Sequence, residues 1–439
     1  MKCTEVEDCF LDMIFSLKHN LQEKIAMPTS YAEETIIDIS LFREPNWDPD
    51  CCIYKVPKRL RNVKDAAYTP KLILIGPVHH NREEPENMKI METLKKRYFN
   101  IFFSRTKKIR DDFEKIVEKN KDKIRHCYAE EITLPEGKHF VDMILLDSIF
   151  IIELFLRSDA KEEENDYILS KPWLKDGVRQ DLILLENQVP FFILDELYQD
   201  FATSTGYQAS FLTLACKYFF NSEEKICDEK KVKHFTDLHR YFFQPPNQKP
   251  GDPIVHRHSA TKLDMAGLKF QNREGEMAGL ISRNRKGEEK NRDLLHVEIQ
   301  KDNKTEDLFR NLMALEQCHY PDEAYICNYI LLLDFLINSK DDVELLVEEG
   351  IIVNSLGSNK AVADMVNKLG HEIVEKNSYY YNVAEDLNKY YRNWWNQNME
   401  SLKTVYFRDI WRGTATVVGI IVLVVTVMNF LRPFVFKHI

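Results

Sequence analysis

Apolar residues recur at helical spacing along most of the chain, with charged residues between them. From residue 85 to residue 132 they return every three or four positions, which predicts amphipathic helices that bury one face. The segment Lys138–Arg157 is apolar on most sides, so it predicts a helix inside the core. Further helical patterns cover residues 211–220, 308–315, 324–337, 343–349 and 361–369. Leu331–Leu336 is apolar nearly all round, so the helix of residues 324–337 is expected to be central. The sequence therefore predicts a mainly α-helical globular body with a few short β-strands.

The stretch Asp181–Leu197 interrupts the helical pattern, because two apolar runs flank Glu186, Asn187 and Gln188. Pro190 disfavours helical backbone at the preceding residue, so one helix is expected to end here and another to begin. Such a break leaves backbone groups without helical partners, and Asn and Gln side chains can satisfy them inside a core. The competing hypothesis makes Glu186 a buried general base, but the sequence places no His or nucleophile near it.

Strands are predicted only at a few places. Ile53–Leu60 and Leu72–Ile75 are the best candidates, since the second is short, apolar and followed by a Gly-Pro turn signal. Residues 271–290 are rich in Arg, Glu, Gly and Asn and have no periodicity, which predicts a flexible insertion. A long amphipathic helix is expected to begin near Val383 and to continue up to Trp411.

The stretch Thr414–Leu431 is apolar and has no charge over 18 residues. A helix rises about 1.5 Å per residue, so this length is just enough for the hydrocarbon core of a bilayer. Trp411 and Phe430 lie near the expected interfaces with the headgroups. The alternative is a buried helix of a soluble protein, which would have to fold back onto the body. We expect a transmembrane helix over residues 412–432 whose residues 414–431 contact lipid.

The residues before and after the helical body complete the predicted domain organisation. Residues 1–52 are expected to form an amphipathic helix and a connector, since the acidic start is unlike a secretory signal peptide. Residues 53–411 would form the helical body, and residues 433–439 a short tail. We expect a tail-anchored, single-pass protein of the plasma membrane or an endomembrane, with its bulk in the cytosol. A glycan on the sequon at Asn303 would contradict that orientation.

Composition limits the partners and the compartment. The net charge of −10 over 439 residues argues against nucleic-acid binding, which needs a surplus of Lys and Arg on one surface. The nine Cys are odd in number and include no CxxC pattern, which favours free thiols in a reducing compartment. No GxGxxG, GxxxxGK, GxSxG, HExxH or EF-hand pattern occurs, so no nucleotide, nucleophile or metal motif is recognised.

Two sets of polar residues are candidates for a metal site or a catalytic site. His79 and His80 are adjacent and would point apart on a strand, which makes them a poor metal pair. Asp142 and Glu153 share a helix face but lie roughly 16 Å apart along the axis, and Asp147 points elsewhere. A glycosidase pair needs about 5 to 10 Å. We therefore assign no catalytic, cofactor-binding or metal residues. The alternative is an enzyme whose site is assembled from the dispersed residues His79, His80, Asp142 and Glu186.

Several segments resemble the plant domain-of-unknown-function family 247. They include LLENQVPFF from Leu184, and the segments Ile53–Arg61, Ala67–Asn81, Asp142–Phe155, Ser259–Phe270, Leu308–Tyr320 and Leu345–Gly357. They follow the order of the family and cover nearly everything from Ile53 onward. The resemblance implies a plant protein with one membrane span and no established catalytic activity, in a family with members implicated in self-incompatibility recognition. It implies a membrane-anchored recognition or signalling module with an unknown protein partner.

Overall fold

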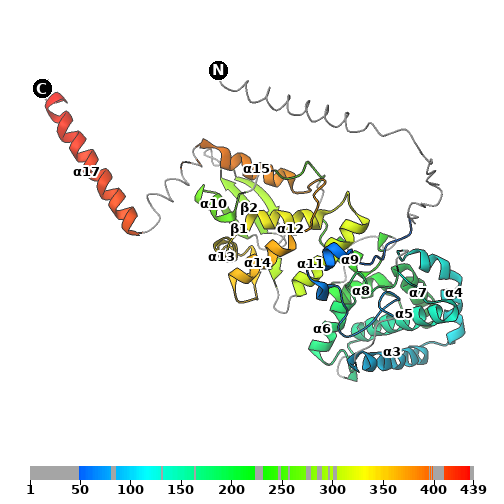
Figure 1. Ribbon diagram of the computed structural model, residues 1–439. Helices are drawn as coiled ribbons and strands as arrows, with labels where there is room; N and C mark the ends of the chain where they lie inside the picture. Colours follow the sequence, from blue (N-terminus) through cyan, green and yellow to red (C-terminus); the bar gives the residue numbers. More distant parts are fainter. Residues whose placement is uncertain are drawn as a thin grey trace, which may run out of the picture. The chain divides into compact units, whose positions relative to one another are not determined.

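Helices dominate the computed structural model (Figure 1). It describes residues 49–80, 86–129, 132–162, 165–222, 231–245, 249–255, 258–272, 278–283, 289–294, 297–299, 304–394, 396, 398 and 410–435. The predicted N-terminal helix and most of its connector, and the last four residues of the predicted tail, lie outside these ranges. The predicted fold class, a mainly α-helical body with a few strands and one long apolar helix near the C-terminus, is confirmed.

The first hydrophobic core surrounds α5 (Gly137–Asp159), which is buried from Phe140 to Leu156 apart from Asp142 and Leu146. Four helices pack against α5 (Figure 1): α3 (Glu86–Arg105), α4 (Arg110–His126), α7 (Phe191–Thr205) and α8 (Phe211–Phe220). α5 is central because its sequence is apolar all round, whereas α4 carries one apolar face with charged residues opposite. The buried and the amphipathic helices are therefore distributed as their sequence patterns predict.

A second hydrophobic core is built from the helices of the C-terminal half. They are α10 (Ala260–Met265), α11 (Lys304–His319), α12 (Tyr325–Leu336), α13 (Lys340–Glu348), α14 (Asn359–Leu369) and α15 (Tyr381–Arg392). α12 is buried on nearly every side, as its apolar sequence predicts. Among the residues that the structure describes, the body also contains the helices α2 (Lys58–Arg61), η2 (Asp65–Ala67), α6 (Pro172–Asp181) and α9 (Phe235–Phe242). A small third core, which includes Ala67, Leu185 and Leu315, joins η2 and the central break to α11.

The predicted strand Ile53–Leu60 is wrong. Ile53 forms only an isolated bridge with Tyr128, and Lys58–Arg61 forms the short helix α2. Pro57 accounts for the change, because its fixed φ suits the residue that precedes a helix and it has no N–H for a strand ladder.

The predicted strand Leu72–Ile75 is also wrong, although the segment is largely buried. Its backbone N–H groups bond to the side chains of Asp181 and Asn187 instead of a neighbouring strand. Gly76 ends the segment with φ of +71°, and a Cβ there would lie 2.3 Å from the Gln188 carbonyl oxygen. Only Gly fits this close approach of two chain segments.

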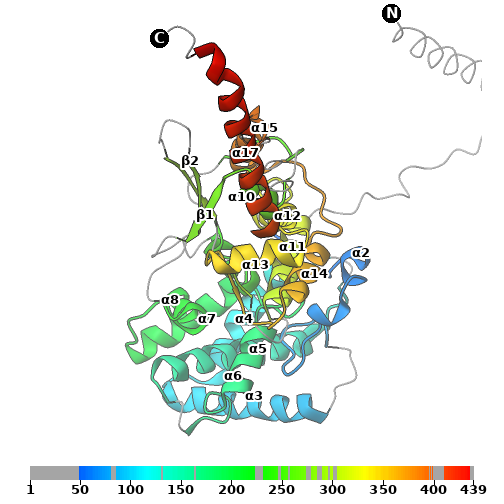
Figure 2. The ribbon, with the colours of Figure 1, turned by 90° about the vertical axis from the view of Figure 1, so that its left-hand side faces the viewer.

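Residues 271–290, where the sequence has no periodicity and predicts a flexible insertion, contain strands in the described residues. β1 (Lys269–Asn272), β2 (Ala278–Arg283) and β3 (Glu289–Leu294) form an antiparallel sheet in the order β1-β2-β3, and Figure 2 shows β1 and β2 side by side. The register pairs Lys269 with Ile281 and Ala278 with Leu294. The backbone supplies the ladder hydrogen bonds, so strands can form in a polar segment without an apolar alternation.

Two short strands and the helix α17 are the other elements with defined bounds in the described residues. β4 (Val297–Ile299) pairs in parallel with β5 (Ile352–Asn354), and β5 contacts α13. The pairing therefore brings the segment before α11 close to α13. α15 ends at Arg392, since the next residue, Asn393, has extended backbone. The predicted unbroken helix from Val383 to Trp411 is therefore wrong at this position. α17 (Ile410–Val435) contains the predicted membrane segment.

Candidate functional site

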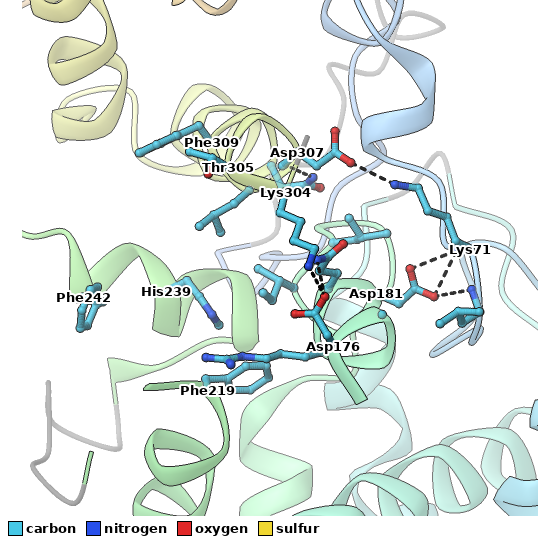
Figure 3. A pocket seen from close by; sticks show the side chains of 18 of the residues that line it. Lys71, Asp176, Asp181, Phe219, His239, Phe242, Lys304, Thr305, Asp307 and Phe309 are labelled. Atoms are coloured by element: carbon cyan, nitrogen blue, oxygen red, sulfur yellow. Dashed lines mark hydrogen bonds and ion pairs between the residues drawn. The ribbon is translucent and has the colours of Figure 1, made fainter. Parts of the chain in front are cut away.

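A cavity of about 780 Å³ lies where the two main cores meet. Its walls come from the segment around Lys71, from α6, from the ends of α8 and α9, and from the first turns of α11 (Figure 3). These elements are far apart in the sequence, so the cavity exists only because the chain folds back on itself. It has the size of an ordinary small-molecule site.

The central break supports one side of the cavity, and the predicted role of its amides is confirmed. The Asn187 side chain accepts from the Ile75 N–H at 2.7 Å and donates to the Asp181 carbonyl at 2.9 Å. The Gln188 amide donates to the Leu182 and Leu184 carbonyls, both at 2.7 Å. The two side chains thus pair the backbone groups that the end of α6 leaves unpaired.

Asp181, the last residue of α6, holds the Lys71 segment against the cavity. Its carboxylate accepts the backbone N–H groups of Lys71 at 3.0 Å, Leu72 at 2.6 Å and Ile73 at 2.9 Å. Burial nevertheless raises the pKa of Asp181 to about 6, because desolvation outweighs these bonds. The Leu72 side chain also lies close to Gly177, so the segment packs directly onto α6.

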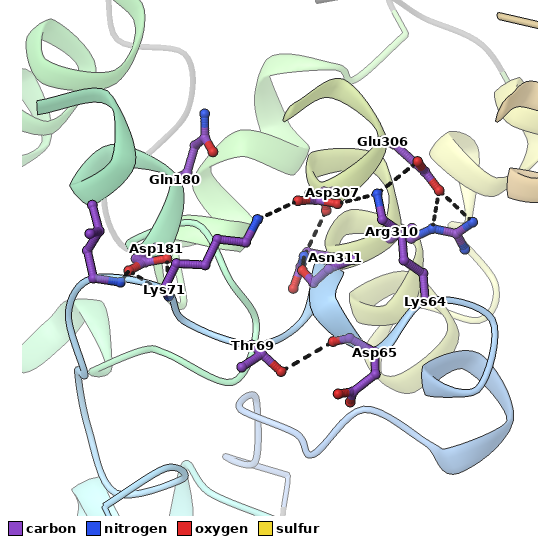
Figure 4. Close-up of polar contacts among 12 residues, drawn as sticks. Lys64, Asp65, Thr69, Lys71, Gln180, Asp181, Glu306, Asp307, Arg310 and Asn311 are labelled. Atoms are coloured by element: carbon purple, nitrogen blue, oxygen red, sulfur yellow. Dashed lines mark hydrogen bonds and ion pairs between the residues drawn. The ribbon is translucent and has the colours of Figure 1, made fainter. Parts of the chain in front are cut away.

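A charged network fastens the start of α11 to the same segment (Figure 4). Asp307 accepts from the ammonium groups of Lys64 at 2.8 Å and Lys71 at 3.0 Å. Glu306 accepts from Lys64 and from Arg310, and these cations hold the pKa of its carboxyl below the usual range although burial opposes them. The network positions α11 as one wall of the cavity.

Aromatic rings form the apolar part of the cavity. The rings of Phe220 and Phe242 stack with centroids 4.7 Å apart and an interplanar angle of 2°. Phe219 and Phe243 line the cavity beside them, and Phe309 faces them from α11. Phe242 is 52% exposed, so the cavity reaches solvent on this side.

Three cations and three carboxylates also line the cavity, and one of the cations, Arg179, is attracted by Asp176 but forms no close ion pair. Lys71 pairs with Asp307 at 3.0 Å, and Lys304 pairs with Asp176 at 2.5 Å. Arg179 projects from α6 and makes no hydrogen bond or ion pair with any residue that the structure describes. Desolvation lowers the pKa of the Arg179 guanidinium, which still remains charged at any ordinary pH.

His239 adds a hydrogen-bond acceptor to the cavity. Its Nδ1 lies 2.9 Å from the Phe235 carbonyl oxygen, so Nδ1 carries the proton and donates it. Nε2 is then a bare lone pair, and it has no partner among the described residues. Figure 3 shows the imidazole projecting from α9 toward Asp176 and Phe219. Burial, together with the nearby charge of Arg179, lowers the pKa of His239 to about 4, so the ring is neutral at pH 7.

Protonation of His239 is expected to destabilise the protein in acid. Its folded pKa of about 4 lies below the unfolded value of about 6.5, so its contribution is complete above pH 6.5 and is lost as the pH falls toward 4. We expect His239→Phe to reduce the loss of unfolding free energy between pH 7 and pH 4.5 by about 2.5 kcal/mol. Denaturant unfolding at both pH values measures this difference, and equal losses in the two proteins would contradict it.

The structure brings together only two of the four residues of the dispersed enzyme site. Nε2 of His79 lies 3.2 Å from a carboxylate oxygen of Glu186, although the ring nitrogen is not aligned for a hydrogen bond. His80 instead contacts His139 at 2.9 Å, and Asp142 pairs with Arg110. The other two carboxylates considered for a catalytic pair are held by cations, Asp147 by Lys95 and Glu153 by Arg157.

Glu186 is held by its neighbours through one carboxylate oxygen. One oxygen accepts from the Val56 N–H at 2.6 Å and pairs with the Arg61 guanidinium, while the other faces His79. Burial alone would raise the pKa of Glu186, but His79 and Arg61 hold it below the usual range. A carboxylate with a lowered pKa, one of whose oxygens is already held by Val56 and Arg61, is a poor general base. Within the described ranges, no group of three or more His, Cys, Asp or Glu is arranged to hold a metal ion.

Sequence reasoning missed the residues that make the cavity distinctive. Arg179 lies in an ordinary amphipathic helix, and His239 lies in the run LHRYFF, which in the sequence is marked only by the Gln-Pro-Pro that ends it. The only available signal was the density of aromatic residues around 219–220 and 242–243. Aromatic residues are more often core than site, so that signal did not single them out.

Comparisons with known proteins place the cavity inside a shared region. The model of a family described as plant protein of unknown function, DUF247, matches residues 53–425. The UPF0481 protein At3g47200 of Arabidopsis thaliana is 29% identical over 417 residues, which cover 86% of this chain and 85% of that protein. The putative UPF0481 protein At3g02645 of Arabidopsis thaliana is 30% identical over 126 residues, or 28% of this chain and 24% of that protein. No solved structure matches the chain.

Proposed function

We propose that this chain, which belongs to the plant protein family of unknown function DUF247, is a single-pass membrane protein whose helical body recognises another protein. The family resemblance found in the sequence is confirmed by the match over residues 53–425. The observation that carries the proposal is α17, in which Gly413–Leu431 has a mean hydropathy of 2.3 and no part buried against the body. An apolar surface of this extent is unfavourable in water and favourable in lipid.

The apolar residues of α17 are exposed on all sides of the helix, which supports a membrane span rather than a helix that docks on another protein. Leu423 is 63% exposed and Val425 is 50% exposed, although they point to nearly opposite sides of the helix. A helix that docks on a protein groove carries an apolar stripe on one side and polar residues on the other. Apolar residues all round are what a helix surrounded by lipid requires.

The thiols support a body in the cytosol. Cys52 and Cys127 are buried next to each other, and a hydrogen bond between them together with burial raises the pKa of the Cys52 thiol. Neither thiol takes part in a disulfide, and the same holds for the other four described cysteines. Adjacent thiols that are not oxidised to a disulfide are typical of a reducing compartment.

Recognition is favoured over catalysis because the polar residues of the alternative enzyme site mostly pair with other parts of the body instead of with one another. The alternative enzyme site has one supporting contact, between His79 and Glu186, and Glu186 is committed to Val56 and Arg61. Trp173 on α6 is 66% exposed. Trp is enriched among the residues that contribute most to protein–protein binding, so this surface suits a protein partner.

Proximity labelling in plant cells tests the proposal. We expect the full chain to label a set of proteins that is reduced when α17 carries Val422→Lys and Val425→Lys, because the body then leaves the membrane. Trp173→Ala should keep the protein at the membrane and lose at least one labelled neighbour. Identical labelling by the full chain and both variants would contradict the proposal.

The orientation is tested separately. With the body in the cytosol, protease added to sealed membrane vesicles from the cytosolic side should digest it, and Asn303 should carry no glycan. Protection of the body from protease, together with a mass increase removable by glycosidase and absent in Asn303→Gln, would place the body on the other side.

A further inference from the structure

We propose that the cavity between the two cores binds a small aromatic carboxylate that also carries a hydrogen-bond donor, such as a hydroxyl group. The proposal concerns the interior of the body and does not depend on the membrane anchor or on a protein partner. It rests on the size of the cavity, on its aromatic wall and on two polar groups that have no hydrogen-bond partner among the described residues.

The cavity is large enough and open enough for such a molecule. Its volume of about 780 Å³ lies within the roughly 300–1,000 Å³ of small-molecule sites. Its lining combines aromatic rings with a few polar groups that converge on the same space, as ligand sites do. Solvent reaches it past Phe242, so a ligand has an entry path.

Arg179 selects an anion. Among the described residues that line the cavity, the two lysines form ion pairs with Asp307 and Asp176. The Arg179 guanidinium is attracted by Asp176 but makes no hydrogen bond or close ion pair with a described residue. A partly buried cation without a close ion pair carries a desolvation cost that a carboxylate would relieve. The planar guanidinium fork matches the two oxygens of a carboxylate.

The remaining charges select a single negative charge rather than a phosphate. Asp176, Asp181 and Asp307 all line the cavity, and each is anchored by protein partners. A second negative charge on the ligand would meet these carboxylates without a further unpaired cation to offset them. A monocarboxylate therefore fits the charge balance better than a phosphate dianion.

His239 selects a donor on the ligand. The imidazole is 4% exposed, lines the cavity, and presents Nε2 as an acceptor because Nδ1 donates to Phe235. Nε2 has no hydrogen-bond partner among the described residues, and a ligand hydroxyl would donate a hydrogen bond to it. Both charged oxygens of the carboxylate are acceptors, so they cannot serve this position.

The aromatic wall selects a flat apolar body. Phe220 and Phe242 stack face to face, and Phe219 and Phe243 lie beside them around His239. Aromatic pairs contribute about 0.5 to 1.5 kcal/mol beyond the area that they bury. A planar ring system can lie against these rings while its carboxylate reaches the Arg179 side.

Isothermal titration calorimetry with the full-length protein in lipid nanodiscs tests the proposal. The probes are 6-hydroxy-2-naphthoate, 2-naphthoate and 2-naphthol, each with empty nanodiscs as the blank. We expect 6-hydroxy-2-naphthoate to bind roughly threefold to tenfold more tightly than 2-naphthoate, and at least about tenfold more tightly than 2-naphthol. No heat with 6-hydroxy-2-naphthoate up to millimolar concentration, or equal affinity for all three probes, would overturn the proposal.

Variants assign the selectivity to the two residues. Arg179→Gln should abolish the preference for 6-hydroxy-2-naphthoate over 2-naphthol, and His239→Phe should abolish its preference over 2-naphthoate. Lys175→Gln removes a cation from the same helix outside the cavity and should keep both preferences. Each readout is a ratio of two ligands on one protein, so a change in the folded fraction cancels. Unchanged preferences in Arg179→Gln and His239→Phe would overturn the proposal.

Discussion

Replacing Arg240 with methionine is expected to lower the free energy of unfolding by about 3 to 5 kcal/mol. Arg240 is 2% exposed, and its guanidinium lies between the rings of Tyr320 and Tyr325, at 3.9 Å and 4.2 Å from their centroids. Its Nε lies 3.3 Å from the carboxylate of the fully buried Glu316. Methionine fills much of the same volume but leaves Glu316 as a buried charge without its cation.

The pH dependence identifies the cause of this loss. Burial raises the pKa of Glu316 to about 7 even in the presence of Arg240. The folded pKa of this carboxyl lies above its unfolded value, so its contribution to stability is lost as the pH rises through about 7. Without Arg240 the penalty for the ionised form grows. We therefore expect the destabilisation by Arg240→Met to be larger at pH 8 than at pH 5.

Denaturant unfolding of the wild type and Arg240→Met at pH 5 and pH 8 measures the effect. Glu316→Gln in the Arg240→Met background is the matched control, because it removes the charge and can still accept a backbone N–H of α12, which Ile326 and Cys327 donate in the wild type. It should recover part of the stability at pH 8. A loss that is the same at both pH values and is not recovered would mean that packing, rather than the buried charge, accounts for the effect.

Two lysines in the middle of α17 are expected to release the protein from membranes. A Lys at the centre of a transmembrane helix costs about 2.5 to 3.5 kcal/mol, so Val422→Lys together with Val425→Lys costs about 5 to 7 kcal/mol. The two positions lie near the middle of Gly413–Leu431 and are exposed, so the substitutions do not disturb a packed interior. The reason is that lipid cannot hydrate the ammonium groups.

Alkaline carbonate extraction measures this release. The wild type should stay in the membrane pellet, and the double-lysine variant should move to the supernatant. Val422→Leu with Val425→Leu is the control, since it changes the same side chains without adding charge, and it should stay in the pellet. A wild-type protein that is fully extracted by carbonate would exclude α17 as an anchor.

The pattern of apolar and polar residues within a segment was sufficient to predict its structure where the segment is surrounded by one kind of environment, such as an apolar core or lipid. α5 and α12 were predicted as buried helices because they are apolar all round, and the core and lipid each favour that composition. The break between α6 and α7 was also predicted, since Pro190 restricts the backbone before it and Asn187 and Gln188 can pair its orphaned groups.

Local pattern failed where a distant side chain competes for the backbone. Leu72–Ile75 has the composition of a strand, but its N–H groups bond to Asp181 and Asn187, which lie more than a hundred residues away. In residues 271–290 the difference runs the other way, because strands form where the sequence has no strand pattern. Its described residues form strands because neighbouring backbone segments pair, which needs no apolar alternation.

The sequence by itself determined the helical class, the place of the central break, the apolar helix near the C-terminus and the family. Each depends on the order of apolar and polar residues within one segment, or on motifs that can be read along the chain. Only the tertiary structure decided the cavity, because Lys71, Arg179, His239 and Asp307 come from four separate segments. Whether a buried cation or imidazole has a partner depends on which segments pack beside it, and no local pattern specifies that.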